Sequence, residues 1–475
     1  MTSWRIDPID EPALREPRRP RIVRVIAVSV ASLLMANGVI LAEHYSNQDF
    51  ASLLADGVRD ARTALAKALD PDQQDQVLGG VENTTTTSAP TGSSTTTPTT
   101  APPATTETTA PAGAGPVATV PPVTARPAAA PPVNNSIETA VPALSAFVEK
   151  ERALKFKAPV TLTVLDDAAF KARLAERRMA VLEADARQAQ GVMRALGLIA
   201  PDVDLAAQVR RLSTGSATAF YDKAANELIL KAGPVTPFAR KILVHELTNA
   251  LDDQHFELDR PALRGGVNEP GSAFEAVAQG IAARVEERFL ATLSAADKQS
   301  VEAEQRRLAA LIPRDIPQYV LVSFGFPFTA GLRLANALAG AGGQDRLNSA
   351  LQSPPVSTEQ VLRPEKFGAG EAPRPVPAPA ADGNVILQGS LGQLNLSLML
   401  AEVLEAGYAE GAADGWGGDS FVAWQNGAQT CVRLAIDMDN ADENLEMSEA
   451  LADWAAERPG AVIEGTGPFT VTRCA

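Results

Sequence analysis

The alternation of apolar and polar residues along the chain predicts a mainly helical α+β protein. Helical spacing of apolar residues extends over 137–155, 167–193, 272–292, 298–311, 320–340, 392–408 and 441–456. Short β-branched or alternating runs predict strands over 160–165, 220–222, 227–231, 421–424, 430–436 and 469–473. The strands of 220–231 form a short β-hairpin directly before the helix that carries His245. We therefore expect a helical domain over 137–380 and a small α+β unit over 381–475.

The uncharged apolar run over 25–42 is long enough to cross a bilayer as one helix. Arginines cluster before this run, whereas Glu43 and Asp49 follow it, so the positive-inside rule places a basic tail over 1–24 in the cytoplasm. A cleaved signal peptide is the alternative, but the preceding segment is long and no clear cleavage site closes the run. We predict a single N-terminal transmembrane helix that anchors the chain in the cell membrane, with its bulk outside the cytoplasm.

The segment between the anchor and the folded part has two compositions. A juxtamembrane segment over 43–83 is followed by a Thr/Pro/Ala-rich stretch over 84–135, which cannot bury a core and is typical of a disordered stalk. A proline-stiffened stalk extends by about 3.1 Å per residue, so it reaches more than ~100 Å, which suits a position in or beyond a cell wall. The apolar stretch over 320–340 contains glycines, a proline and Arg333, which favour a buried core helix over a second membrane span.

Charge and cysteine content narrow the classes of partner. The net charge is −15, and no basic cluster follows residue 25, which argues against a nucleic-acid partner. Cys431 and Cys474 both fall on the predicted outer side of the membrane. We expect them to form a disulfide that ties down the C-terminal segment, with two free thiols as the alternative.

Residues 245–249 differ by one residue from the H-E-x-x-H motif of zinc peptidases. In that motif, two histidines four residues apart bind zinc from one face of a helix, and the glutamate is the general base. Asn249 replaces the second histidine, and its amide oxygen is a weaker zinc donor than imidazole nitrogen. We interpret His245 as a residual ligand and Glu246 as a vestigial base. Asp252 and Asp253 are predicted to be solvated or capping acids, because acidic residues are common on exposed helix faces.

Several landmarks occur together downstream of residue 140. They are Phe220-Tyr221-Asp222, the HELTNALDDQHF run from His245 to Phe256, Ser357-Thr-Glu-Gln360 with Leu362 and Pro364, and Gly415-Trp-Gly-Gly-Asp419. In this order they resemble a family of bacterial and archaeal gluzincin-like zinc metallopeptidases, which implies a metallopeptidase-like fold for the ectodomain.

The resemblance places the third zinc ligand, a glutamate, at Gln279, which precedes Gly280. Gln393 is a further amide where the family has Gly-Glu. Two of the three implied ligand positions, Asn249 and Gln279, therefore carry amides. Glu275 lies one helical turn before Gln279 on the same face, so it is a candidate substitute ligand.

These changes lead to three hypotheses about function. The first is a pseudopeptidase with no metal cofactor, which binds a peptide or protein partner in the old cleft. The second is an extracellular metallopeptidase that uses His245, Glu275 and Asn249 around zinc or another divalent metal, if a site is retained. The third is a structural protein of the cell envelope.

Overall fold

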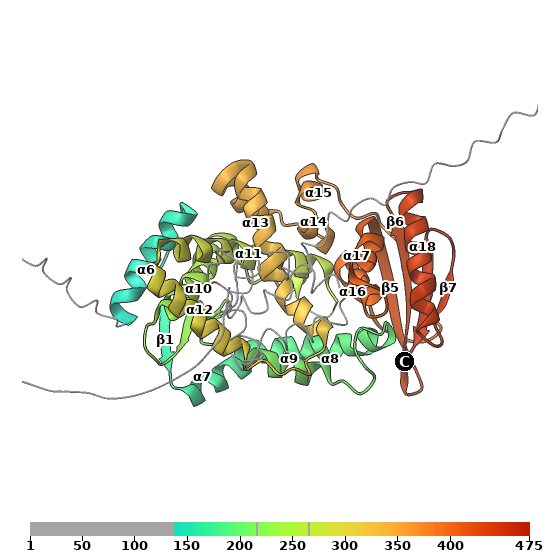
Figure 1. Ribbon diagram of the computed structural model, residues 1–475, viewed down its shortest axis with the longest axis horizontal. Coiled ribbons are helices and arrows are strands. Elements are labelled where there is room, and N and C mark those ends of the chain that lie inside the picture. The colour runs from blue at the N-terminus through green and yellow to red at the C-terminus, as the bar shows by residue number, and fades with distance from the viewer. Residues whose placement is uncertain (1–136, 215–216, 265–266) are drawn as a thin grey trace, which may run out of the picture. The chain divides into compact units, whose positions relative to one another are not determined.

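A computed structural model describes residues 137–475 of the chain, except 215–216 and 265–266 (Figure 1). The predicted basic tail, membrane anchor, juxtamembrane segment and stalk all lie outside the described residues. The predicted α+β class is confirmed for the described part, which combines many helices with two small sheets.

The first half of the described chain contains the hairpin and the motif helix. Its elements are α6 (Ile137–Arg152), β1 (Thr161–Leu165), α7 (Asp167–Leu174), the π-helical turn η1 (Ala175–Met179), α8 (Ala180–Ala195), α9 (Leu205–Thr214), β2 (Ala219–Asp222), β3 (Glu227–Lys231), α10 (Pro237–Phe256) and the 3-10 turn η2 (Pro261–Leu263). Helix α10 begins where Thr236 accepts a hydrogen bond from the Ala239 N–H, with Pro237 in the first turn.

The second half contains the long central helices and the C-terminal sheet. Its elements are α11 (Glu269–Thr292), α12 (Ala295–Ala309), α13 (Gln318–Gln352), α14 (Thr358–Leu362), α15 (Pro364–Ala369), β4 (Val385–Gly389), α16 (Gly392–Ala401), α17 (Ala406–Asp414), β5 (Trp416–Asn426), β6 (Gln429–Met438), α18 (Ala441–Ala456), β7 (Val462–Glu464) and β8 (Phe469–Cys474).

The first sheet has the strand order β1-β3-β2, so β2 is an edge strand. Strand β1 runs parallel to β3, and β2 pairs with β3 in the antiparallel direction. One face of this sheet packs through Phe220 and Ile229 against α7 and η1. The other face packs through Leu228 and Leu230 against α6 and α10. The sheet therefore holds η1 and α10 on opposite sides of the same edge strand.

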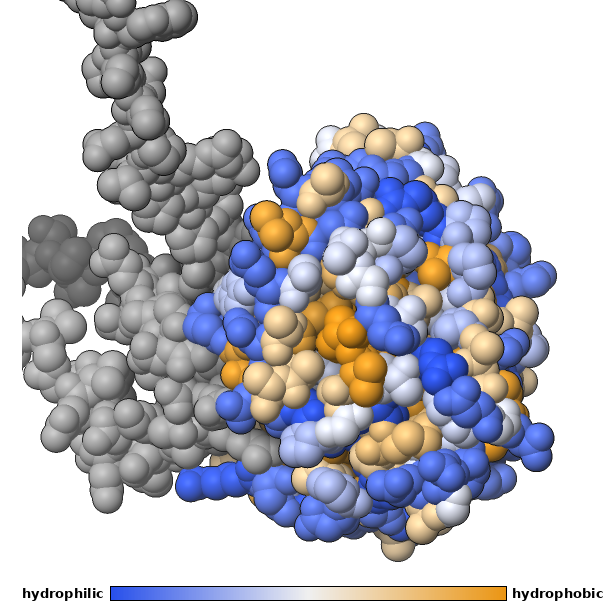
Figure 2. All heavy atoms as spheres, turned by 90° about the vertical axis from the view of Figure 1, so that its right-hand side faces the viewer, coloured by the Kyte–Doolittle hydropathy of each residue, from blue (hydrophilic) through white to orange (hydrophobic). Residues whose placement is uncertain are grey.

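The second sheet has the order β4-β5-β6-β8-β7, with antiparallel neighbours throughout. Helices α8, α16, α17 and α18 share the main hydrophobic core with its inner face. This core includes residues from both sides of position 380, where the sequence predicts the boundary between the helical domain and the C-terminal unit. On the face of the molecule that Figure 2 shows, apolar residues lie in small groups separated by polar ones.

Helices α11 and α13 cross at close range (Figure 1). A Cβ atom added to Gly280 would lie 2.1 Å from the Gly331 carbonyl oxygen, so the two backbones touch without intervening side chains. Helix α13 is long and apolar enough to span a membrane, but 56% of its most apolar window is buried inside the protein. This burial agrees with the core helix predicted over 320–340.

The structure corrects the helix predicted over 392–408. The chain leaves the helix after Ala401 and starts α17 at Ala406, where Glu405 caps the new helix by accepting a hydrogen bond from the Tyr408 N–H. A capping side chain favours a helix start at this point over continuation of the first helix. Several short elements were not predicted from the sequence: α9, α14, α15, β4, β7 and the turns η1 and η2.

Candidate functional site

The main cleft has a volume of about 660 Å³ and is lined by η1, β2, α10, α11 and α13. All five residues that the sequence singled out for metal chemistry contribute to its lining: His245, Glu246, Asn249, Glu275 and Gln279. They come from two adjacent helices, because α10 carries the first three and α11 carries the other two. The fold thus brings the altered ligand positions together as the motif requires.

Two of the implied ligand residues, His245 on α10 and Gln279 on α11, are in direct hydrogen-bond contact. His245 Nε2 lies 2.8 Å from Gln279 Oε1, and both side chains are buried. Gln279 Nε2 in turn donates to Glu275 Oε1 at 2.9 Å. Glu275 also forms an ion pair with Lys223, at 3.2 Å between Nζ and Oε2. Side chains of α10, α11 and the turn after β2 therefore form one continuous polar chain.

The other ring nitrogen of His245 faces a second carboxylate. His245 Nδ1 lies 3.2 Å from Glu286 Oε2, and Lys241 Nζ lies 2.7 Å from Glu286 Oε1. Lys241 and Glu286 are almost completely buried. Sequence reasoning missed both residues. Helical spacing was the available signal, because Lys241 precedes His245 by four positions and Glu286 follows Gln279 by seven.

Charge at Glu275 fixes the orientation of the Gln279 amide. Burial raises the pKa of Glu275, but Lys223 and Arg178 outweigh it and hold the pKa below its ordinary value. An ionised carboxylate only accepts hydrogen bonds, so Gln279 must turn its NH₂ group to Glu275 and its oxygen to His245. His245 must then carry a proton on Nε2.

The same argument applies to the second nitrogen of His245. Burial alone lowers the pKa of His245, but the hydrogen bond to Glu286 and the charges of Glu246 and Glu286 raise it above its ordinary value. Acceptors thus face both ring nitrogens, and the imidazolium form satisfies both. The lone pair that would bind a metal is occupied by a proton.

The residues present do not fit a zinc ion. In a four-coordinate site with bonds of about 2.1 Å, two ligand atoms lie about 3.4 Å apart. The 2.8 Å between His245 Nε2 and Gln279 Oε1 is shorter and corresponds to a direct hydrogen bond. Two amides and a protonated imidazole also lack the charge and basicity of a zinc ligand set.

Glu246 is held at the edge of the first sheet. Its Oε2 atom accepts the backbone N–H of Tyr221 at 3.0 Å and the side-chain Nδ2 of Asn249 at 3.4 Å. Asn249 Oδ1 is buried and has no hydrogen-bond partner among the described residues. Asn249 Oδ1 is therefore an acceptor that the site leaves unused, and the protein holds Glu246 through its Oε2 atom.

The prediction of solvated or capping acids after the motif is wrong for Asp252, whereas Asp253 is half-buried and accepts a backbone N–H just past the end of α10, as a capping acid does. Asp252 is buried and pairs with buried Arg152 at 2.8 Å, which joins α10 to α6. Asp253 accepts hydrogen bonds from the Tyr221 hydroxyl and the Leu258 N–H. The prediction failed because α6 covers this part of α10, a contact between residues 100 positions apart. His255 bonds the Lys155 carbonyl oxygen at 2.8 Å.

The other landmark residues form structural contacts away from the main cleft. Glu269, at the start of α11, accepts hydrogen bonds from the backbone N–H and hydroxyl of Thr358. Asp419 accepts from the Leu391 and Gly392 N–H groups and from the Trp416 indole. A smaller cavity of about 480 Å³ is bordered by both carboxylates. These landmarks join α11, α14, α16 and β5.

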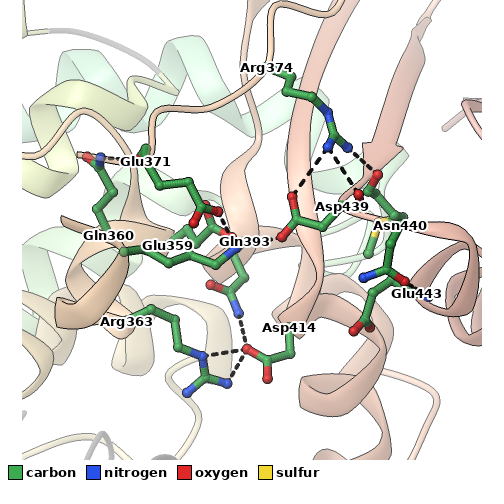
Figure 3. Close-up of polar contacts among 12 residues, drawn as sticks. Glu359, Gln360, Arg363, Glu371, Arg374, Gln393, Asp414, Asp439, Asn440 and Glu443 are labelled. Atoms are coloured by element: carbon green, nitrogen blue, oxygen red, sulfur yellow. Dashed lines mark hydrogen bonds and ion pairs between the residues drawn. The ribbon is translucent and has the colours of Figure 1, made fainter. Parts of the chain in front are cut away.

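Gln393, the further amide that the resemblance singled out, lies outside the main cleft. Its Nε2 lies 3.4 Å from Asp414 Oδ1, and the same oxygen accepts a hydrogen bond from Arg363 (Figure 3). The structure therefore separates Gln393 from His245 and Gln279, and the amide takes part in a polar contact of the C-terminal unit.

Three carboxylates near Gln393 lie close enough together to hold a metal ion: Glu359, Glu371 and Asp439 (Figure 3). Lys366 occupies the centre of this cluster. Its Nζ atom lies 2.6 Å from Glu359, 2.9 Å from Glu371 and 2.6 Å from Asp439. The ammonium group already supplies the positive charge that such a cluster requires, so the cluster is an ion-pair network.

The predicted disulfide is confirmed. Cys431 on β6 and Cys474 on β8 are bonded and stand opposite each other in the strand register. The bond therefore fastens the last strand of the chain to the middle of the C-terminal sheet.

Comparison with known proteins gives one finding for the C-terminal unit. Residues 384–473 match a family described as a domain of unknown function, DUF8575. No curated protein and no solved structure matched the chain. The matched region begins at β4 and ends in β8, so it does not include the cleft residues of α10 and α11.

Proposed function

We propose that this chain is a membrane-anchored, extracytoplasmic protein of metallopeptidase-like architecture that binds extended peptide in its main cleft without hydrolysing it. The run over 25–42 would be the anchor, and the stalk over 84–135 would hold the folded part away from the membrane. The observation that carries the proposal is the hydrogen bond between His245 and Gln279, which joins two metal-ligand positions to each other.

The open edge of β2 supports peptide as the ligand. The Lys231 N–H donates to the Thr218 carbonyl, and the antiparallel register continues from this pair to Phe220 and Ile229. Because hydrogen-bonded pairs alternate along an antiparallel ladder, the main-chain groups of Ala219 and Tyr221 point away from β3. The bond from the Tyr221 N–H to Glu246 agrees with this direction. An added strand would meet the remaining outward main-chain groups of Ala219 and Tyr221 here, because the Tyr221 N–H is already bonded to Glu246.

The state of Glu246 supports binding without catalysis. A general base in a metallopeptidase removes a proton from metal-bound water, so this role requires a ligand set that holds the metal. Asn249 and Gln279 carry amides at two of the three implied ligand positions, and Glu246 Oε2 accepts hydrogen bonds from Tyr221 and Asn249. The unpaired Asn249 Oδ1 is available to accept a hydrogen bond from a ligand.

The test compares metal content and hydrolysis between the full-length chain and its Asn249→His, Gln279→Glu double variant. We expect the wild type to contain no stoichiometric zinc by elemental analysis, to leave a fluorogenic peptide library intact and to bind members of it. The double variant should take up one zinc per chain. Adding Glu246→Gln to the double variant is the control, because it should keep the zinc and remove any hydrolysis.

One tightly bound zinc in the wild type, with chelator-sensitive hydrolysis, would overturn the proposal and favour the rearranged metallopeptidase. For that reading Glu275 must release both Lys223 and Gln279 before it can bind a metal. Absence of peptide binding in the wild type would leave the structural cell-envelope role as the better description.

A further inference from the structure

We infer that the cleft prefers peptides that carry an acidic side chain, and that Arg178 is the residue that selects it. This inference rests on the proposed peptide-binding function and names the ligand class. It begins from the π-helical turn η1, which lines the cleft beside the edge strand β2. Such turns interrupt regular helices and are frequent at functional sites.

Arg178 differs from the other cations that line the cleft. It is half-buried, and none of its hydrogen-bonding atoms has a hydrogen-bond or ion-pair partner among the described residues. The neighbouring cations are engaged: Arg177 with Asp222, Lys223 with Glu275, Arg264 with Asp259, and Arg260 with the carbonyl oxygens of Phe256 and Leu351. Arg178 is therefore the guanidinium group in the described lining that can still take a carboxylate.

The attraction for an anion comes from Arg178 itself and not from the cleft as a whole. Acidic and basic side chains both line the cleft, and the carboxylate of Glu275 forms its ion pair with Lys223, at 3.2 Å. A ligand carboxylate would give Arg178 the partner that the described residues do not supply.

The position of η1 indicates that Arg178 meets a side chain of the peptide and not its terminus. A peptide that adds to β2 extends the sheet, and its side chains point alternately to the two faces. Turn η1 and α7 cover the face that contains Phe220, whereas α10 covers the opposite face. A ligand side chain on the Phe220 face therefore points toward η1, where a carboxylate can pair with Arg178.

One wall of the cleft, on α13, is aromatic. Tyr319, Phe324 and Phe328 of α13 line it, and all three are half-buried. Phe328 also lies beside the His245 ring, with 5.8 Å between the ring centroids. Apolar ligand side chains next to the acidic one would contact this wall. The ligand is thus an extended peptide with one acidic residue flanked by apolar ones.

The experiment measures binding of capped heptapeptides to the full-length chain by fluorescence anisotropy. The peptides are N-acetylated and C-amidated, have apolar flanks, and carry Glu, Gln or Ala at the central position. We expect the Glu peptide to bind about five- to tenfold more tightly than the Gln peptide, the range for one partly desolvated ion pair. Arg178→Gln should abolish this preference and leave affinity for the Gln peptide unchanged, whereas Arg178→Lys should retain part of it.

The matched control is Arg306→Gln, which removes the same charge from an exposed position on α12 and should leave the preference intact. Equal binding of Glu and Gln peptides to the wild type would overturn the inference and leave the proposed function standing. Persistence of the preference in Arg178→Gln, or binding only to peptides with a free C-terminal carboxylate, would also overturn it. Absence of binding to any capped peptide would overturn both proposals.

Discussion

The single substitution Gln279→Glu tests whether the old metal position is filled by a hydrogen-bonded chain. In the wild type the Gln279 amide donates to Glu275 at 2.9 Å and accepts from His245 at 2.8 Å. A carboxylate at position 279 keeps the acceptor and loses the donor. It also places two carboxylates at hydrogen-bonding distance in a buried site.

The expected change in the free energy of unfolding follows from these two distances. At an effective dielectric constant of 20, a unit charge about 2.8–2.9 Å from another has an interaction energy of about 6 kcal/mol. The repulsion from Glu275 and the attraction to protonated His245 therefore nearly cancel. What remains is the lost hydrogen bond to a charged acceptor, about 1.5–3 kcal/mol, and the desolvation of a new buried charge. We expect the variant to be less stable than the wild type by about 2–4 kcal/mol near pH 8.

Urea unfolding of the full-length chain at pH 8 and pH 5, with chelator present, measures this difference. At the lower pH the new carboxyl group takes up a proton and can donate to Glu275 again, so the stability gap should narrow. Gln299→Glu is the matched control, because it makes the same change at an exposed position on α12 and should be nearly neutral. A Gln279→Glu variant as stable as the wild type at pH 8 would refute the proposed hydrogen-bond arrangement.

Three further predictions concern stability. Burial raises the pKa of Glu269 to about 8. The contribution of this carboxyl group to the free energy of unfolding is therefore fully present below its ordinary pKa and is lost as the pH rises through about 8. The urea midpoint should fall over that pH interval, and Glu269→Gln should flatten the decline. Gly280→Ala should cost at least about 2 kcal/mol in thermal unfolding by forcing α11 away from α13, whereas Gly340→Ala, in open space, should not destabilise. Arg152→Met should cost about 3–5 kcal/mol because it leaves Asp252 buried without its cation, and adding Asp252→Asn should recover part of that loss.

Local patterns in the sequence predicted the elements that carry the candidate site. The hairpin of β2 and β3, the motif helix and α11 all follow from apolar periodicity, and the structure places Asn249, Gln279 and Glu275 in one cleft with His245. Helical spacing also relates Glu275 to Gln279. These relations lie within single elements, where the period of the helix fixes which side chains are neighbours.

Contacts between elements that are far apart in the sequence could not be predicted from local patterns. The sequence gives no measure of the distance between α10 and α11, so the direct bond between His245 and Gln279 could not be foreseen. The prediction for Asp252 was wrong for the same reason, since its partner Arg152 lies on α6. The π-helical turn at Arg178 could not be predicted either, because no residue pattern marks it.

The contact between Gly280 and Gly331 makes the packing of α11 against α13 independent of the side chains that line the cleft. Backbone atoms set the spacing of α11 and α13 at a point one residue from Gln279, so this spacing does not depend on the side chain at position 279. In many metalloproteins the binding of the ion stabilises the folded state, so removal of the ion unfolds the protein. Here the helix crossing provides that rigidity from peptide groups alone. Substitutions in the cleft can accumulate, or revert, while the surrounding architecture persists.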